Sequence, residues 1–202
     1  MKIAVVGASG MIGSRITHEL AGRGHEVTAV TRSGSEVADA STSIAGDLAD
    51  AEFVRSLATG HDVVVSATGP SRTGADHQIW LDAMSTAEQN LGSTRFFVVG
   101  GAGSLLVDGT RLVDLPDFPQ AYRAEATTAA KVLDSLRAAP ESLDWAYLSP
   151  APEIAPGERT GAYKVSDDTP AGEHISAEDF AVAVSDEIEQ PKHRRARFTV
   201  AN

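Results

Sequence analysis

The stretch that decides the fold is Lys2-Ile3-Ala4-Val5-Val6-Gly7-Ala8-Ser9-Gly10-Met11-Ile12-Gly13. Its first five residues have the continuous apolar character of a buried strand. Apolar side chains then recur at positions 12, 16 and 20, which share one face of a helix. A second apolar run, residues 26–30, follows the glycines at 22 and 24. The stretch therefore predicts a strand–helix–strand unit whose first turn carries spaced glycines, an arrangement that binds dinucleotides.

The glycines of this turn have separate expected roles. Gly7 permits a sharp turn, Gly10 lets a pyrophosphate approach the backbone, and Gly13 lets the helix pack closely on the strand. Free N–H groups and the positive end of the helix dipole then face the phosphates. The alternative is a purely structural glycine turn. We expect the phosphates to lie on the turn made by Gly7, Ser9, Gly10, Met11, Ile12 and Gly13.

Arg32 follows the second strand, between Thr31 and Ser33. In this unit the tip of the second strand lies beside the adenosine ribose, where an acidic residue accepts hydrogen bonds from the 2′-hydroxyl. A guanidinium flanked by two hydroxyls suits a 2′-phosphate instead. We therefore expect NADP(H) to be preferred over NAD(H). The alternative for Arg32 is an ordinary solvated surface arginine.

Composition limits the number of domains, the kinds of partner and the metal sites that the chain can have. The chain has 202 residues, no cysteine, 17 Lys and Arg against 28 Asp and Glu, and a net charge of −11. We expect one domain over residues 1–202, as a monomer or homodimer, with no nucleic-acid or membrane partner. Scattered histidines and absent cysteines argue against a metal. Without a signal peptide or an apolar run of membrane-spanning length, we expect a cytoplasmic protein.

Strands and helices alternate along the rest of the chain. This pattern predicts an α/β fold of the Rossmann type, a doubly wound and mostly parallel sheet with helices on both faces. Segment 150–174 is rich in Pro, Gly and charge. This composition fits either a substrate-side loop or an ordinary surface excursion that can include a short strand pair. The further expected strands are 42–45, 62–67, 95–99, 144–148 and 197–200, and the further helices 51–58, 76–91, 120–138 and 176–190.

Several motifs together resemble the atypical short-chain dehydrogenase/reductase superfamily. The chain is most similar to its small single-domain members, the NADH-flavin reductase group, which is related to the NmrA-like and biliverdin reductase B-like groups. The resemblance covers almost the whole chain. The motifs that carry it are residues 7–13, Gly46-Asp47-Leu48, Ser66-Ala67-Thr68-Gly69, residues 99–105, Asp144-Trp145, Leu148-Ser149-Pro150, Pro156-Gly157-Glu158-Arg159-Thr160-Gly161 and residues 175–181.

The resemblance implies roles for residues at the strand ends. Asp47 and Leu48 would hold the adenine. The cofactor ribose and phosphates would contact Ala67, Thr68 and Gly69, while Gly101 to Ser104, Ser149 and Pro150 would border the nicotinamide. Ser176 and Asp179 match a segment that caps the last helix, so we expect a structural role for both.

One departure from the superfamily bears on the chemistry. Carbonyl-reducing members use Tyr and Lys four residues apart on one helix face, but Tyr122 is followed at that distance by Ala126. Tyr163 and Lys164 are adjacent and face opposite sides of a strand. Two functions remain: an NAD(P)H-dependent reductase of a flavin or quinone-like small-molecule acceptor, and a non-catalytic NADP(H) sensor of NmrA-like type. For the reductase, Ser104 is the candidate polar contact at the nicotinamide, with a structural serine as the alternative.

Overall fold

The computed structural model describes residues 1–202 and is built around one eight-stranded sheet. Seven strands run parallel, and only β10 is antiparallel to its neighbour β12. The predicted doubly wound α/β fold is confirmed. The strand order is β10 (Lys164–Ser166), β12 (Ala196–Ala201), β8 (Trp145–Pro150), β5 (Arg95–Val99), β4 (Val63–Ser66), β1 (Lys2–Val6), β2 (Glu26–Thr31) and β3 (Thr42–Ala45).

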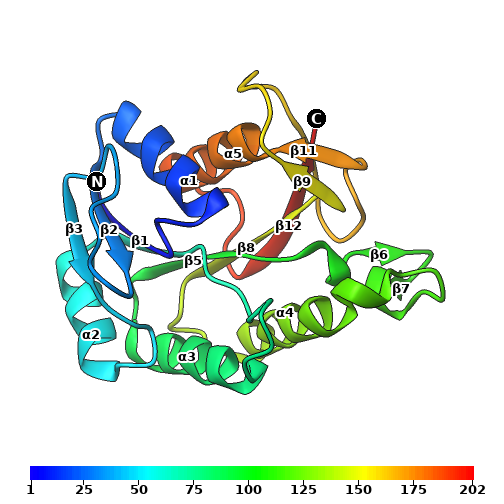
Figure 1. Ribbon diagram of the computed structural model, residues 1–202, viewed down its shortest axis with the longest axis horizontal. Helices are drawn as coiled ribbons and strands as arrows, with labels where there is room; N and C mark the ends of the chain where they lie inside the picture. Colours follow the sequence, from blue (N-terminus) through cyan, green and yellow to red (C-terminus); the bar gives the residue numbers. More distant parts are fainter.

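Helices cover both faces of the sheet (Figure 1). On one face lie α1 (Met11–Gly22) and α5 (Ala177–Glu189), and on the other α2 (Ala51–Gly60), α3 (His77–Asn90) and α4 (Gln120–Ala138). Each face has its own buried core. Ile16, Leu20 and Phe180 belong to the first, whereas Met84 and Leu133 belong to the second.

The order of strands fixes where a ligand binds. β1 lies inside the sheet, with β2 on one side and β4 on the other, so that Ile3 is opposite both Val27 and Val63. From β1 the chain passes to β2 and β3 on one side, and it then returns through α2 to β4 on the other side of β1. In an open parallel sheet, ligands bind outside the carboxyl ends of the strands at such a switch point. The turn after β1, residues 7–10, stands at this place.

Segment 150–174 is more ordered than a plain loop. Residues of β9 (Glu153–Ala155) pair in parallel with β11 (His174–Ser176), and β10 between them joins the edge of the main sheet. A small hairpin of β6 (Leu106–Val107) and β7 (Thr110–Arg111) precedes α4. The β9–β11 pair agrees with the alternative of a surface excursion that includes a short strand pair. The positions of these strands do not follow from the sequence, because two or three residues are too few to show an apolar period.

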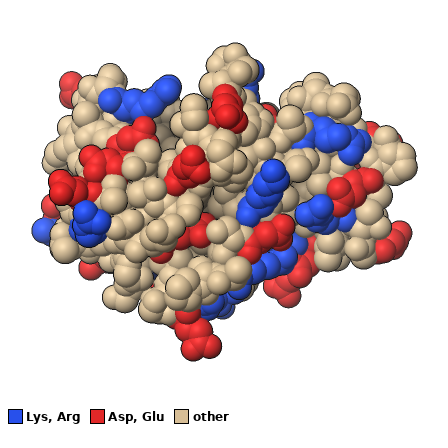
Figure 2. All heavy atoms as spheres, turned by 90° about the horizontal axis from the view of Figure 1, so that it is seen from below, with Lys and Arg blue, Asp and Glu red and all other residues tan.

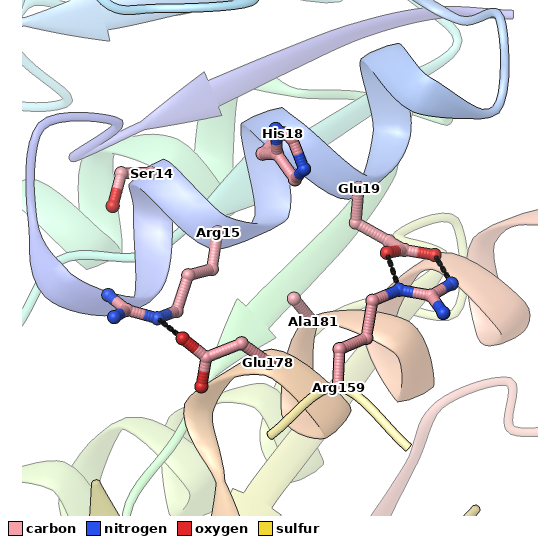
Figure 3. A pocket seen from close by; sticks show the side chains of 7 residues that line it. All are labelled: Ser14, Arg15, His18, Glu19, Arg159, Glu178 and Ala181. Atoms are coloured by element: carbon pink, nitrogen blue, oxygen red, sulfur yellow. Dashed lines mark hydrogen bonds and ion pairs between the residues drawn. The ribbon is translucent and has the colours of Figure 1, made fainter. Parts of the chain in front are cut away.

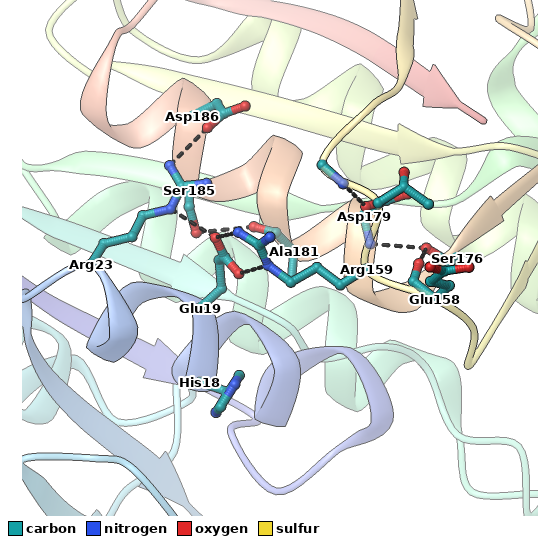
Figure 4. A network of polar contacts seen from close by, with 12 residues as sticks. His18, Glu19, Arg23, Glu158, Arg159, Ser176, Asp179, Ala181, Ser185 and Asp186 are labelled. Carbon is teal, nitrogen blue, oxygen red and sulfur yellow. Dashed lines mark hydrogen bonds and ion pairs between the residues drawn. The ribbon is translucent and has the colours of Figure 1, made fainter.

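Carboxylates from α1 and α5 hold residues 156–161 (Figure 4). Glu19 accepts hydrogen bonds from Arg159 Nε at 2.7 Å and from Arg159 Nη2 at 2.8 Å. Asp179 accepts from Thr160 Oγ1 at 2.5 Å and from the Gly161 N–H at 2.7 Å. Two carboxylates that are distant in sequence therefore fasten one segment.

The expected cap of α5 is confirmed only in part. Ser176 Oγ accepts the Asp179 N–H at 3.0 Å, as an N-cap does. The expectation that Asp179 also caps this helix is wrong. Its carboxylate bonds the 156–161 segment and Asn202 instead, and the Ser176 N–H donates to Asn202 Oδ1 at 2.8 Å. These partners lie 18 to 23 residues from Asp179 in sequence, so local spacing does not reveal them.

Acidic and basic side chains are interspersed on the face of the molecule seen from below Figure 1, which Figure 2 shows. This face therefore has no broad basic patch, in agreement with the chain's net negative charge. None of the helices combines the length and the apolar character needed to cross a membrane.

The carboxylates around residues 156–161 predict a fall in stability in acid. Burial raises the pKa of Asp179, but hydrogen bonds from Thr160, Gly161 and Asn202 outweigh it, and the pKa lies below its usual value. Hydrogen bonds from Arg159 likewise lower the pKa of Glu19. A carboxylate with a lowered folded-state pKa stabilises above its unfolded-state pKa, about 4, and this contribution is lost as pH falls.

Asp179→Asn should therefore reduce the free energy of unfolding at pH 7 by about 1.5–3 kcal/mol, the range for hydrogen bonds to a charged group. Its stability should also fall less steeply below pH 4 than that of the parent protein. Urea denaturation between pH 7 and pH 3 measures both effects. Asp117→Asn, at an exposed position, is the control. Identical pH dependence for the Asp179 variant and the parent would contradict this assignment.

Candidate cofactor-binding site

The turn after β1 is shaped by contacts that exclude side chains. Gly7 has φ of +84°, a conformation that favours glycine, and a Cβ there would lie 2.7 Å from the Ala67 carbonyl oxygen. A Cβ at Gly13 would lie 2.2 Å from the Gly7 carbonyl oxygen. Helix α1 therefore rests directly on the turn, as the sequence predicts for Gly13. Gly10 closes the turn by donating its N–H to Gly7 O at 3.0 Å.

The first turn of α1 is open to a ligand. Side chains cap α2, α3 and α5, whereas the N-cap of α1 is Gly10, which has none. The N–H groups of Met11, Ile12 and Gly13 donate to no protein acceptor, and no acidic residue lies in this turn. Unsatisfied N–H groups and an unscreened helix dipole bind anions. This turn therefore fits the diphosphate of a dinucleotide, and Ser9 beside it is exposed.

Arg32 provides a free positive charge at the end of β2. Its side chain is exposed and forms no hydrogen bond or ion pair with the protein. The neighbouring Ser33 hydroxyl bonds Ser35 Oγ at 2.6 Å. The Gly46 N–H donates to Thr31 O at 3.0 Å and so ties the end of β3 to the end of β2. An unpaired guanidinium beside this junction suits a phosphate more than a ribose hydroxyl.

The end of β3 is held by a turn and an aromatic ring. Asp47 Oδ1 accepts the Ala49 N–H at 2.9 Å, and Leu48 is 2% exposed. The ring of Phe53 covers Gly46 so closely that a Cβ there would lie 2.1 Å from a ring carbon. Asp47 and Leu48 thus shape this end of the crevice, and their contact with adenine stays a prediction. The sequence analysis missed Phe53, which explains why residue 46 is glycine.

The turn after β4 lies against the turn after β1. Ala67 donates its N–H to Val6 O at 2.8 Å. The Thr68 hydroxyl bonds Ser66 Oγ at 2.9 Å and accepts from Trp80 Nε1 at 2.9 Å. Gly69 is exposed, with open space where a Cβ would be. The structure thus brings Ala67 and Thr68 to the glycine turn and gives Thr68 a structural role as well. Contact of Ala67, Thr68 and Gly69 with the cofactor stays a prediction.

The predicted nicotinamide end is formed by the carboxyl ends of β5 and β8. Gly101 is partly exposed there, and Pro150 ends β8. Ser149 is fully buried, and its hydroxyl has no hydrogen-bond partner. Ser104 is 6% exposed, and its Oγ lies 3.4 Å from Arg197 Nη1. This contact favours the structural alternative for Ser104 over a catalytic one.

Two of the chain's three tyrosines have a raised pKa, which does not favour proton donation. Tyr122 is 62% exposed on α4. Burial raises the pKa of Tyr147 to about 12. Burial and the adjacent Asp186 carboxylate, which accepts the Tyr163 hydroxyl at 2.7 Å, also raise the pKa of Tyr163. Neither Tyr147 nor Tyr163 forms its hydrogen bonds with a lysine.

A hollow of about 410 Å³ lies between α1 and α5 (Figure 3), apart from the glycine turn. Its arginines are already neutralised, since Arg15 Nε pairs with Glu178 at 2.5 Å and Arg159 Nε with Glu19 at 2.7 Å. The N–H groups of the glycine turn and the Arg32 side chain, in contrast, are free. The free groups mark the better anion site. No group of three or more His, Asp or Glu side chains is arranged to hold a metal ion.

Comparison with known proteins agrees with this geometry. The model of the NAD(P)H-binding family matches residues 7–191, and the chain belongs to this family. The uncharacterized protein YwnB of Bacillus subtilis is 38% identical, over 100% of this chain and 99% of its own.

Two solved structures are also similar along their whole length. A Streptococcus pneumoniae protein, named a "putative NADH-flavin reductase", is 36% identical with a TM-score of 0.90, covering 100% of this chain and 99% of that one. A Burkholderia pseudomallei protein, named a "putative exported protein", is 41% identical with a TM-score of 0.88, covering 100% of both chains. The resemblance inferred from the sequence motifs is thereby confirmed.

The contacts that an added Cβ would make with Gly7 O predict different outcomes for substitutions at Gly10 and at Gly13. A Cβ at Gly10 would lie 3.3 Å from Gly7 O, a contact that small shifts relieve. Gly10→Val should therefore fold but lose NADPH binding, because its side chain occupies the phosphate position. Gly13→Ala should lose about 1–3 kcal/mol or more of stability, the cost of overpacking.

Thermal denaturation and NADPH titration of each variant measure these effects. Gly22→Ala is the control, since nothing lies within 4 Å of the added Cβ. Unchanged NADPH affinity in Gly10→Val would show that the phosphates bind elsewhere.

Proposed function

We propose that the protein is an NADPH-dependent reductase that passes hydride to a flavin or a quinone-like acceptor. The observation that carries this proposal is the open glycine turn, with its unpaired N–H groups, beside the free guanidinium of Arg32. The missing tyrosine–lysine pair argues against alcohol–ketone chemistry, which needs a positioned acid. Flavins and quinones do not need one as strongly, because their own heteroatoms accommodate the transferred charge.

In this proposal the protein mainly binds and orients. The N–H groups of residues 11–13 hold the diphosphate, and Arg32 holds the 2′-phosphate. A bound nicotinamide supplies the hydride, and stacking brings the acceptor within reach. The acceptor takes up the hydride together with a proton from water, so no protein acid is required. Ser104, which is buried, is left outside the reacting groups.

The similar Streptococcus pneumoniae protein, which is named a "putative NADH-flavin reductase", supports a flavin acceptor. That name mentions NADH, so the preference for NADPH in this chain depends on Arg32. A cytoplasmic location is part of the proposal, and cell fractionation tests it, since the Burkholderia relative is named an exported protein. The sensor of NmrA-like type is the outcome if the cofactor binds without turnover.

Arg32→Ala tests the cofactor preference. Loss of the guanidinium should weaken NADPH binding by about 1.5–3 kcal/mol, the value of a hydrogen bond to a charged group. NADH affinity should stay nearly constant, because NADH has no 2′-phosphate. Parallel titrations with both cofactors measure the difference. An equal loss for both would remove Arg32 from the 2′-phosphate site.

NADPH oxidation tests the reaction. We expect turnover with FMN or riboflavin, and little with simple alcohols or ketones. Tyr122→Phe should lower flavin turnover less than about tenfold, well below the 10²–10⁴-fold contributed by a general acid. Stopped-flow or steady-state absorbance at the NADPH band follows the reaction. A hundredfold fall in kcat for this variant would make Tyr122 a proton donor. Binding of NADPH without oxidation by flavin or quinone would favour the sensor.

A further inference from the structure

The carbonyl oxygen of Gly100, just beyond β5, accepts no hydrogen bond from the protein. The β5–β8 ladder explains why. Along this ladder the Phe96 N–H donates to Asp144 O at 2.8 Å, and the Gly100 N–H donates to Leu148 O at 2.8 Å. In a parallel ladder the next donor toward Gly100 O comes from two residues beyond Leu148. That residue is Pro150, which has no N–H.

A buried tyrosine orients the same peptide from the opposite direction. Tyr147 Oη accepts the Gly101 N–H at 3.2 Å and donates to Ala129 O of α4 at 3.1 Å. Its ring fills the space of a Gly100 side chain, since a Cβ there would lie 2.0 Å from a ring carbon. In a trans peptide the N–H and C=O point in opposite directions. Holding the Gly101 N–H on Tyr147 therefore turns the Gly100 carbonyl away from that side chain.

The free carbonyl stands at the carboxyl edge of the sheet, where a ligand binds. Gly100 is partly exposed, and β5 is separated from β1 only by β4. A dinucleotide with its adenosine at β2 and its diphosphate at α1 has its nicotinamide beyond β4. The carboxamide of nicotinamide carries two N–H donors, and an orphan carbonyl supplies the complementary acceptor.

We propose that the Gly100 carbonyl accepts a hydrogen bond from the nicotinamide carboxamide, and that Tyr147 is the residue that positions it. The proposal rests on NADP(H) binding in the proposed function, but not on a flavin acceptor. Pro150 also contributes to the availability of the Gly100 carbonyl. By lacking an N–H, it keeps the carbonyl available to the ligand.

Calorimetric titration with two probes tests Tyr147 without relying on catalysis. NADP⁺ contains the nicotinamide, whereas adenosine 2′,5′-bisphosphate contains only the adenosine side. Tyr147→Phe keeps the ring against Gly100 and removes the hydroxyl. It should weaken NADP⁺ about three- to tenfold, the range of one net hydrogen bond, and change the bisphosphate less than twofold. Tyr122→Phe, the exposed control, should change neither. Equal loss of both probes by Tyr147→Phe would overturn the proposal.

Pro150→Ala gives an independent arm, because it introduces an N–H that can close the ladder onto Gly100 O. It should weaken NADP⁺ selectively, as Tyr147→Phe does. The acetylpyridine analogue of NADP⁺ has a methyl in place of the amide NH₂, and should bind the parent protein about three- to tenfold more weakly than NADP⁺. This difference should disappear in both variants.

Undiminished discrimination in folded variants would overturn the proposal. Failure of the parent protein to bind adenosine 2′,5′-bisphosphate would contradict the NADP(H) assignment itself. NADP⁺ binding with the expected discrimination, but without flavin turnover, would contradict only the proposed reaction.

Discussion

The contact between the α1 backbone and the Gly7 carbonyl is the constraint on which the rest of the structure depends. A Cβ at Gly13 would lie 2.2 Å from that oxygen, so the helix can reach this position only without a side chain. The same approach leaves the N–H groups of residues 11–13 without a protein acceptor at the switch point of the sheet. The close packing and the unpaired N–H groups that suit a phosphate are therefore two results of one missing side chain.

The polar and charged groups of this acidic chain form two sets, one paired within the protein and one unpaired. The carboxylates of Glu19 and Asp179 are hydrogen-bonded to residues 156–161, and Arg159 is paired with Glu19. These charged groups stabilise a segment of the chain and are not free to bind a ligand. The first N–H groups of α1, at the glycine turn, and the Arg32 side chain, at the end of β2, have no partner in the protein. A protein of net charge −11 thus presents a few local donors to an anion, and not an attractive overall field.

Much of this organisation is predictable from sequence, and the exceptions have physical causes. Strands such as 95–99 and helices such as 120–138 have the predicted bounds, because their apolar patterns are long and regular. Tyr147 is different. From its place in the apolar run of β8, the sequence predicts only an ordinary core residue. Its role depends on contacts with Gly100 and Gly101, which follow the neighbouring strand β5. The carboxylate of Asp179 was misassigned for the same reason, since non-local partners compete with the local cap.

The two halves of the crevice also differ in how far apart their residues lie along the chain. The glycine turn, Arg32 and the turn after β4 all lie within the first 70 residues. The predicted nicotinamide end instead combines β5 with β8, and β8 is flanked by β12 near the end of the chain. The edge strand β10 has β12 as its only neighbour, and Arg197 of β12 also binds Asp168 in the segment that follows β10. The second half therefore depends on contacts of longer range in sequence, whose formation costs more loop-closure entropy during folding.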